Sequence, residues 1–333
     1  MGHLDQGEWK QQSLAALSSG GDFKRSVTTF RNWVTADGSA GPSGDAGFKA
    51  ESGRYHLYVS YACPWAHRTL IFRSLKQLDD HISVSVVHPD MLDDGWTFAE
   101  DFPGATGDHL FGKTYMREIY TEADPKVSGR VTVPVLWDKA TGKIVSNESA
   151  EIIRMFNTAF NDITGDTQDF YPDALRSEID EVNARIYDEV NNGVYKSGFA
   201  TSQDAYDTAV TTLFDALDWL EARLSQQRYL VGDTVTEADW RLITTLLRFD
   251  AVYHGHFKCN RNRLVDFPNL WAYARELYQW PGVAGTDRPD HYIRHYHYSH
   301  ESVNPFRIIP IGPRIDWTEP HGRDRQFPDA KSA

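Results

Sequence analysis

The chain has 333 residues, of which 41% are hydrophobic and 24% charged, and its formal net charge is −13. Length and composition indicate a globular protein of about two domains. The negative charge argues against nucleic acid or an anionic membrane as a partner, and no apolar run approaches the ~20 residues of a membrane span. Two cysteines, Cys63 and Cys259, cannot form a disulfide framework. With no apolar leader at the N-terminus, the sequence predicts a cytoplasmic protein.

The first domain is predicted at residues 51–160, after an arm at residues 1–50 that is polar and rich in glycine and serine. We expect few regular elements in this arm, with an apolar patch at residues 30–34 that packs on the domain. Four runs of apolar and β-branched residues predict strands at residues 55–61, 82–87, 131–137 and 143–146. Helices are expected after the first strand, at residues 113–123 and from Ser149, with Ser146 or Asn147 as the last cap. The order of elements predicts a small α/β domain.

The junction of the first strand and its helix carries Cys63, in the sequence ACPWA. Pro64 suits the first helical position, because its missing N–H costs nothing there. Cys63 would then lie at or beside the N-cap, where orphan N–H groups and the helix dipole favour a thiolate. The fourth position of the motif is Ala66 rather than a second cysteine, so we expect this thiol to react with an outside thiol. The alternative is an inert, packed cysteine.

A polar linker at residues 161–173 leads into a second domain, residues 174–333, in which helical patterns dominate. They predict helices at approximately residues 174–192, 203–225, 237–252 and 267–279. Thr236 and Asp239 resemble a capping box at the start of the third helix, which we interpret as a stability element. The tail from residue 283 is rich in Pro, Gly, His and Arg, and its apolar segment RIIPIGP is expected to pack on the body.

An α/β thioredoxin-like domain followed by an all-α domain resembles the glutathione transferase superfamily over about residues 50–280. The closer resemblance is to the glutathionyl-hydroquinone reductases, the Xi-class transferases. It rests on CPWA, on GWTF at residues 95–98, on VTVPVLWD at residues 131–138 and on SNES at residues 146–149. The long arm, and the C-terminal GP and EPHGR sequences, extend it to both ends of the chain. The resemblance implies the glutathione transferase fold and a homodimer.

Pro134 lies inside the third predicted strand, where a residue without an N–H belongs at an edge, a strand start or a bulge. The resemblance implies that Pro134 is the cis-proline of the thioredoxin fold. It would turn the backbone N–H and C=O of Val133 toward the cysteinyl backbone of glutathione.

The resemblance implies further glutathione contacts on the first domain. Glu148 and Ser149, at a helix N-terminus, would hold the ammonium and the carboxylate of the γ-glutamyl group. Arg130 would pair with a carboxylate of glutathione, and Trp96 would pack against the tripeptide. An isolated Glu-Ser pair or arginine would instead be an ordinary surface feature.

On the second domain the resemblance implies a site for the hydroquinone, formed by Tyr195, Tyr253 and Tyr296. Phenols can stack on an aromatic ring and donate hydrogen bonds to its oxygens. Tyr195 and Tyr296 are also expected to be catalytic, because a phenol can stabilise the carbonyl or enolate oxygen of a reacting keto tautomer. A single tyrosine, taken alone, is more commonly a core or surface residue.

The combined pattern predicts glutathione-dependent reduction of glutathionyl-hydroquinones to hydroquinones, with glutathione as co-substrate. The Cys63 thiolate would attack the glutathionyl sulfur, and a second glutathione would resolve the resulting mixed disulfide. One alternative is a general cysteine-type transferase that reduces glutathione mixed disulfides or dehydroascorbate and needs no tyrosine cluster. Another is a non-catalytic binding module of the same fold, which the Cys63 motif disfavours.

Other residues invite different chemistry. His291, His295, His297 and His300 concentrate imidazoles in the tail, but without HExxH or paired cysteines we expect no metal site. Cys259 has basic neighbours that could lower its pKa, yet we interpret it as structural. The chain has no GxGxxG turn, so dinucleotide binding has no support.

Overall fold

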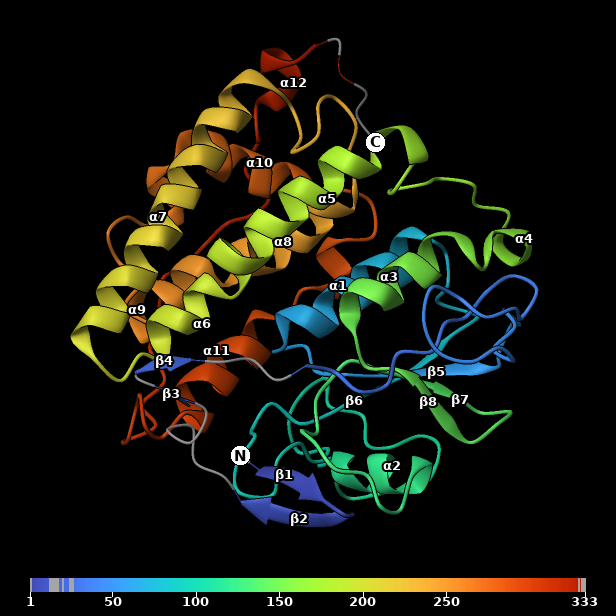
Figure 1. Cartoon of the computed structure of the whole chain (residues 1–333). Coiled ribbons are helices and arrows are strands. Elements are labelled where there is room, and N and C mark those ends of the chain that lie inside the picture. The colour runs from blue at the N-terminus through green and yellow to red at the C-terminus, as the bar shows by residue number, and fades with distance from the viewer. Residues whose placement is uncertain (1, 12–17, 20, 24–26, 329, 331–333) are drawn as a thin grey trace. The chain divides into compact units, whose positions relative to one another are not determined.

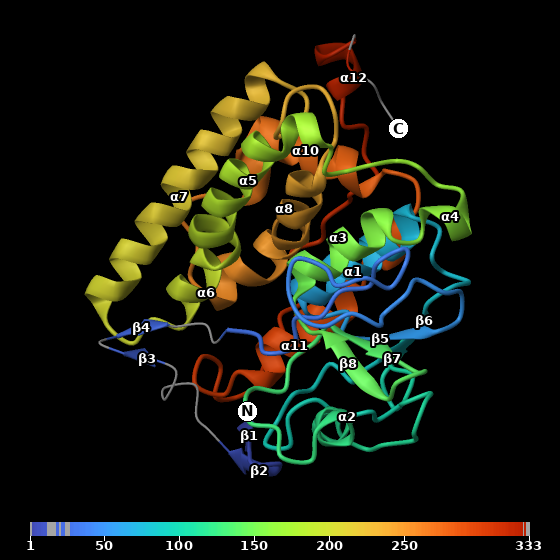
Figure 2. The same cartoon turned by 45° about the vertical axis from the view of Figure 1, so that its right-hand side comes forward.

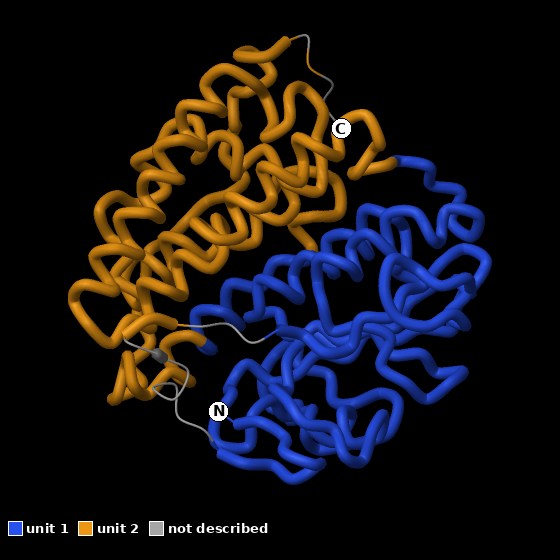
Figure 3. The backbone as a smooth tube through the Cα atoms, in the orientation of Figure 1, with its two compact units in different colours: residues 1–14, 25–168, 286–295 blue, residues 15–24, 169–285, 296–333 orange. Residues whose placement is uncertain are grey.

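The computed structural model describes residues 2–11, 18–19, 21–23, 27–328 and 330. The chain forms two compact units, shown in blue and orange in Figure 3. Unit 1 comprises residues 1–14, 25–168 and 286–295, and unit 2 comprises residues 15–24, 169–285 and 296–333. Unit 1 therefore includes a stretch of the tail that the sequence pattern groups with the second domain.

Unit 1 is built on a four-stranded mixed sheet with the strand order β6-β5-β7-β8. The strands are β5 Tyr55–Val59, β6 Ser83–Val86, β7 Val135–Asp138 and β8 Lys143–Ser146. β5 and β6 run parallel, whereas β5–β7 and β7–β8 are antiparallel pairs. α1 (Pro64–Leu75) and α3 (Ser149–Thr158) lie side by side over one face, and α2 (Met116–Ala123) lies on the other (Figures 1 and 2). This arrangement confirms the thioredoxin-like fold.

The third strand begins later than its sequence pattern predicts, at Val135 rather than at residue 131. Pro134 has no N–H to donate, so pairing with β5 starts only after it. The peptide bond between Val133 and Pro134 is cis, as the family resemblance implies.

The N-terminal arm is more regular than expected. β1 (Gly2–Asp5) pairs with β2 (Glu8–Gln11), and β3 (Ser18–Ser19) pairs with β4 (Asp22–Phe23). Gln6 and Gly7 connect the first pair with φ of 52° and 83°, the positive values of a type I′ turn. Residues 27–34 run beside β8, because the Asn32 N–H donates to Val145 and Phe30 accepts from Asn147. The apolar patch therefore packs on the domain as predicted.

Unit 2 contains the predicted helices. Its longer helices are α5 Arg176–Arg185, α6 Gly193–Gly198, α7 Gln203–Gln226, α8 Glu237–Arg248 and α10 Pro268–Tyr278. α8 is buried along its whole length, and Thr236 and Asp239 form its capping box as predicted. α11 (Pro289–Ser299) continues across the boundary between the units. Shorter helical elements are α4 Asn161–Thr164, η2 Asp173–Leu175, η3 Ile186–Asn191, η4 Phe249–Tyr253, α9 His254–His256, η5 Leu264–Asp266, η6 Ala284–Thr286 and α12 Arg323–Gln326.

Arg323 attaches the C-terminal tail to the helices of unit 2. Its buried guanidinium donates to Glu276 over 3.0 Å and to the carbonyls of Leu224 and Gln227 near the end of α7. Cationic side chains at this end of a helix satisfy the last carbonyls and complement the dipole. The prediction that RIIPIGP packs on the body is wrong, since Ile308 and Ile311 are 71% and 98% exposed. In the part of the chain that the structure describes, no helix has the length and apolarity needed to cross a bilayer.

His56 lies on β5, a strand buried on both faces. Its Nδ1 lies 2.7 Å from Ser83 Oγ and its Nε2 lies 2.9 Å from Ser85 Oγ. Burial lowers the pKa of His56 to about 3, so the unfolded chain binds a proton that the folded chain rejects. The associated stability is present above pH 6.5, the ordinary histidine pKa, and is lost as the pH falls below it.

We therefore expect His56 to lower the free energy of unfolding by about 2 kcal/mol between pH 7 and pH 5. Urea unfolding of the wild type and of His56→Asn at both pH values measures this contribution. The variant should lose that part of the pH dependence, and an equal dependence in both proteins would contradict the assignment.

Candidate active site

Cys63 is the N-cap of α1, with φ −80° and ψ 119°, and Pro64 is the first helical residue. The Cys63 N–H donates to the Ser60 carbonyl over 3.1 Å, and the Cys63 carbonyl accepts from the His67 N–H over 3.0 Å. The residue is partly exposed, and its Sγ lies 3.5 Å from the Val133 carbonyl oxygen. The first turn of α1 contains no acidic residue, so no carboxylate of that turn repels a thiolate at Cys63. The strand, turn and helix predicted around Cys63 are confirmed.

Tyr120 of α2 holds the backbone that leads to Val133. Its hydroxyl lies 3.0 Å from the Thr132 carbonyl, to which it donates, and accepts from the Thr132 N–H and the Asn147 side-chain amide. Burial raises the pKa of Tyr120, which keeps the phenol neutral and able to donate. The Tyr120 side chain therefore fixes both the loop before Val133 and the loop before α3. Sequence reasoning missed it, because nothing in its local sequence separates it from an ordinary core tyrosine.

Glu148 is the N-cap of α3, and its Oε1 accepts from the N–H of the second helical residue over 3.1 Å. The prediction of Ser146 or Asn147 as the cap is wrong. Ser146 Oγ accepts from the Glu148 N–H instead, and the Asn147 amide is directed to Tyr120. The cap is therefore a carboxylate at the positive end of a helix dipole, a favourable position for a negative charge.

The N-terminal arm also reaches the start of α3. Thr28 Oγ1 donates to Glu148 Oε2 over 3.1 Å, and Arg31 pairs with Glu151 in the first turn of the helix. Both carboxylate oxygens of Glu148 therefore accept hydrogen bonds from the protein. Ser149 follows at the first helical position and is buried. These contacts fix the carboxylate and the helix start together.

Trp96 lies in the long connection between β6 and α2 and is 7% exposed. Its carbonyl accepts from the Met116 N–H at the start of α2, over 2.9 Å. Its indole stacks on the His295 ring, with 4.8 Å between ring centroids and 21° between planes. Arg130 is partly exposed. All residues predicted for the glutathione site thus belong to unit 1, together with Cys63.

The three tyrosines predicted for the hydroquinone meet in unit 2. The hydroxyl oxygens of Tyr195 and Tyr296 are 2.5 Å apart, and those of Tyr253 and Tyr296 are 3.2 Å apart. Tyr195 is 9% exposed, whereas the other two are almost completely buried. Burial raises the pKa of Tyr253 and Tyr296 well above the ordinary value, against the opposing positive charge of Arg248. Both phenols therefore remain neutral and can donate.

Two π-helical segments help to set this cluster. η3 (Ile186–Asn191) precedes the helix that carries Tyr195, and η4 (Phe249–Tyr253) ends at Tyr253. A π turn adds a residue to the helical turn and so redirects the side chains after it, and such turns are frequent at functional sites. The sequence pattern predicts uninterrupted helices over both stretches, because hydrophobic spacing alone does not reveal the extra residue.

Known families match both units. Residues 62–159 match the N-terminal domain and residues 203–276 the C-terminal domain of glutathione S-transferase. The chain is 58% identical to glutathionyl-hydroquinone reductase YqjG of Escherichia coli (strain K12), over 98% of this chain and 100% of that protein. The chain belongs to the glutathionyl-hydroquinone reductase family. It is also 50% identical to glutathionyl-hydroquinone reductase PcpF of Sphingobium chlorophenolicum, over 94% of this chain and 96% of that one.

Solved structures place this family member among the Xi-class glutathione transferases. The glutathione-bound structure of YqjG matches with a TM-score of 0.91 and 56% identity, over 98% of this chain and 100% of that one. A Xi-class transferase from Natrialba magadii matches with a TM-score of 0.89 and 50% identity, over 98% and 97% of the two chains. The transferase fold predicted from the sequence is confirmed.

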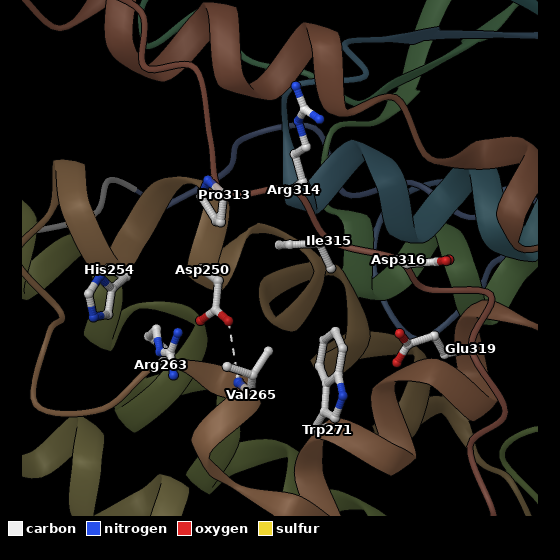
Figure 4. A pocket seen from close by; sticks show the side chains of 10 residues that line it. All are labelled: Asp250, His254, Arg263, Val265, Trp271, Pro313, Arg314, Ile315, Asp316 and Glu319. Atoms are coloured by element: carbon white, nitrogen blue, oxygen red, sulfur yellow. Dashed lines mark hydrogen bonds between the residues drawn. The ribbon is translucent and has the colours of Figure 1, made fainter.

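A cavity of about 380 Å³ lies in unit 2 of this reductase-family chain (Figure 4). Its lining residues are Asp250, His254, Arg263, Val265, Trp271, Pro313, Arg314, Ile315, Asp316 and Glu319. Asp250 accepts from the N–H groups of Leu264 and Val265 and so caps η5, and burial raises the pKa of its carboxyl. None of the residues predicted for the active site lines this cavity, and Asp250 has a structural role.

The histidines of the tail fall into two groups by their partners. His297 lies against His256, with 4.9 Å between ring centroids. His291 and His295 contact the carbonyl oxygens of Pro103 and Pro89, and His300 contacts His256. Among the residues described, no group of three or more His, Cys, Asp or Glu side chains is arranged to hold a metal ion.

The two cysteines of the chain differ in burial. Cys259 is fully buried, and burial raises the pKa of its thiol to about 12, which supports a structural role. Cys63 is partly exposed.

We therefore expect iodoacetamide at pH 7 to modify one cysteine, Cys63, in the folded protein and both cysteines after unfolding. Mass spectrometry counts the adducts, and folded Cys63→Ser protein is the control, which should remain unmodified. Fast modification of both thiols in the folded wild type would contradict the burial of Cys259.

Proposed function

We propose that this chain reduces glutathionyl-hydroquinones to hydroquinones, with glutathione as the reductant. The observation that carries the proposal is the partly exposed Cys63 thiol at the N-cap of α1. Two relatives that match nearly the whole chain carry the name glutathionyl-hydroquinone reductase, and one of them has been solved with glutathione bound. A single thiol with alanine at the fourth motif position fits chemistry in which an outside thiol completes the cycle.

The reacting form of Cys63 is the thiolate. Backbone N–H groups at the start of a helix and the positive end of the helix dipole stabilise a negative sulfur at an N-cap. Pro64 contributes the first helical position without a backbone N–H. The backbone at the start of α1 therefore favours the thiolate form of Cys63.

Thioether cleavage proceeds through the keto tautomer of the substrate, in which the sulfur is bonded to the carbon beside a carbonyl group. The Cys63 thiolate attacks this sulfur, an S–S bond forms, and the ring C–S bond breaks. The electron pair of that bond passes to the carbonyl oxygen as an enolate, which takes up a proton and becomes the hydroquinone. A second glutathione thiolate then attacks the mixed disulfide and releases oxidised glutathione and Cys63. The ring gains two electrons, and two glutathionyl sulfurs are oxidised.

The glutathione portion is assigned to residues of unit 1. Val133 offers its backbone N–H and C=O to the cysteinyl group. Glu148 accepts from the γ-glutamyl ammonium, and Ser149 with the N-terminus of α3 binds the adjacent carboxylate. Arg130 pairs with a carboxylate, and Trp96 packs against the tripeptide. The position of Glu148 at a helix start, already hydrogen-bonded through both oxygens, supports a fixed carboxylate in this role.

The hydroquinone portion is assigned to the phenols of Tyr195, Tyr253 and Tyr296. Their mutual hydrogen bonds hold three hydroxyl groups in one place, and burial keeps at least the phenols of Tyr253 and Tyr296 protonated. Neutral phenols donate to the oxygen on which negative charge develops as the C–S bond breaks. A transferase that reduces only simple mixed disulfides needs no such cluster, so the cluster favours the hydroquinone reaction.

We assign the enzyme to the cytoplasm, where glutathione is kept reduced, because both cysteines are thiols. A homodimer is proposed from the family resemblance alone. Light scattering of the purified protein gives the mass that tests it.

Single-turnover mass spectrometry tests the reaction directly. With a glutathionyl-hydroquinone and no free glutathione, we expect a glutathione-sized adduct on Cys63 and release of free hydroquinone. Cys63→Ala should bind S-methylglutathione as the wild type does but lose turnover completely. An adduct that forms with oxidised glutathione but not with the glutathionyl-hydroquinone would support the general transferase instead.

The tyrosine assignment predicts a selective loss in Tyr296→Phe, which keeps the ring and removes the hydroxyl shared by the other two phenols. We expect kcat for the glutathionyl-hydroquinone to fall about 10²-fold, as is typical when one oxyanion donor is removed. Reduction of a glutathione mixed disulfide with an alkyl thiol should change less than about twofold, because no oxyanion forms. Tyr298→Phe, on the same helix, is the matched control. Equal losses with both substrates would exclude the oxyanion role.

A further inference from the structure

The first half of α11, with the residue before it, fastens the segment that carries Trp96. Arg288, His291, Arg294 and His295 are spaced three, three and one residues apart, which places them along one side of the helix. All four contact residues 89–103. Both partners belong to unit 1, so this is a contact within one compact unit.

The two ends of the segment are held by different interactions. At its start, Arg294 donates Nε and Nη2 to the two carboxylate oxygens of Asp90, over 2.8 and 2.7 Å. At its end, the Pro103 carbonyl accepts from Arg288 over 3.0 Å and from His291 over 2.7 Å. Burial lowers the pKa of His291, so this imidazole is neutral at pH 7 and carries its proton on Nε2. Hydrogen bonds to Arg288 and to α11 therefore fix both ends of the segment.

His295 contacts both the start of the segment, at Pro89, and its middle, at Trp96. Its Nδ1 lies 2.7 Å from the Pro89 carbonyl, and because a carbonyl only accepts, Nδ1 carries the proton. With one edge of the ring fixed in this way, the face of the ring stacks on the Trp96 indole at 4.8 Å and 21°. Both side chains are less than 8% exposed. The hydrogen bond thus sets the plane of the imidazole, and the imidazole sets the plane of the indole.

We propose that His295 is a positioning residue for glutathione, which holds the Trp96 indole in the orientation that receives the tripeptide. The proposal rests on the proposed function only in its assignment of Trp96 to glutathione. The physical reason is preorganisation: an indole already fixed in the unliganded protein loses less side-chain freedom when glutathione binds. Because His295 acts through the indole in this assignment, its effect appears in glutathione affinity rather than in the chemical step.

Two substitutions separate the ring from its hydrogen bond. His295→Asn keeps a donor near the position of Nδ1 and removes the stacked ring, whereas His295→Phe keeps a stacked ring and removes the donor. His254→Asn, at a partly exposed histidine of unit 2, is the matched control. Calorimetric titration with S-methylglutathione, which cannot form a disulfide, measures the dissociation constant. Turnover gives KM for glutathione and kcat.

We expect about tenfold weaker S-methylglutathione binding in His295→Asn and about threefold weaker binding in His295→Phe, with kcat at saturating glutathione within about twofold of the wild type. A role in overall stability alone would instead lower the active fraction and leave KM unchanged. Hydrogen exchange of residues 88–104 should rise in both variants. Unchanged affinity in both variants would overturn the proposal.

A double-mutant cycle with Trp96→Leu identifies the route. If His295 acts through the indole, His295→Asn has no further effect on affinity in the Trp96→Leu protein. The same tenfold loss in that background would show that His295 acts elsewhere, and full affinity in Trp96→Leu alone would remove the premise and the proposal with it. Failure of the wild type to cleave a glutathionyl-hydroquinone would refute the proposed reaction but leave this binding cycle valid.

Discussion

The start of α1 is the constraint on which the candidate active site depends. β5 is one of the two inner strands of the sheet and is buried on both faces, so its direction cannot vary without loss of the core. The turn after it is closed by the N–H of Cys63 on the Ser60 carbonyl and the N–H of Ala62 on Ser60 Oγ. Pro64 then begins the helix. The backbone geometry therefore sets the position of the thiol, because the short cysteine side chain has few rotamers.

The surroundings of this thiol depend on bonds between segments distant in sequence. Thr28 reaches Glu148 across 120 residues, and His295 reaches Pro89 across 206. Tyr120 joins the loop before Val133 to the loop before α3. Loops held at one end sample many conformations, and each of these bonds removes part of that freedom before a ligand arrives. The N-terminal arm and the tail, which extend beyond the two transferase domains, are therefore part of the site's support.

The sequence predicted those parts of the molecule that local rules determine. The strand before Cys63, the helix after Pro64 and the capping box at Thr236 and Asp239 follow from periodicity, proline chemistry and capping. The residues assigned to glutathione and to the hydroquinone came from resemblance, and no spacing rule would have gathered three tyrosines from different helices. The role of Tyr120 and the π turns depend on tertiary contacts that the local sequence does not encode.

The errors have physical causes as well. α11 was not predicted because its sequence is rich in His, Tyr and Arg and has few aliphatic residues. Its buried face combines aromatic side chains such as Tyr292 and Tyr296 with hydrogen bonds to residues 89–103. The segment at residues 306–311 is apolar but exposed. Buried residues are mostly apolar, whereas apolar residues are also common on protein surfaces, so apolar composition alone does not predict burial. At the cap of α3 the pattern favours the short polar residues Ser146 and Asn147. The Ser146 and Asn147 side chains make other hydrogen bonds in the loop before α3, so Glu148 is the residue that caps the helix.

α11 also carries two consecutive residues with different partners. His295 and Tyr296 are neighbours in the chain, and successive side chains of a helix point about 100° apart. His295 stacks on the indole of Trp96 within unit 1, whereas Tyr296 shares hydrogen bonds with the phenols of Tyr195 and Tyr253 within unit 2. Because the two contacts use different side chains, a substitution at one position leaves the other contact in place. The effects of His295 variants on glutathione affinity and of Tyr296 variants on kcat therefore report on separate interactions.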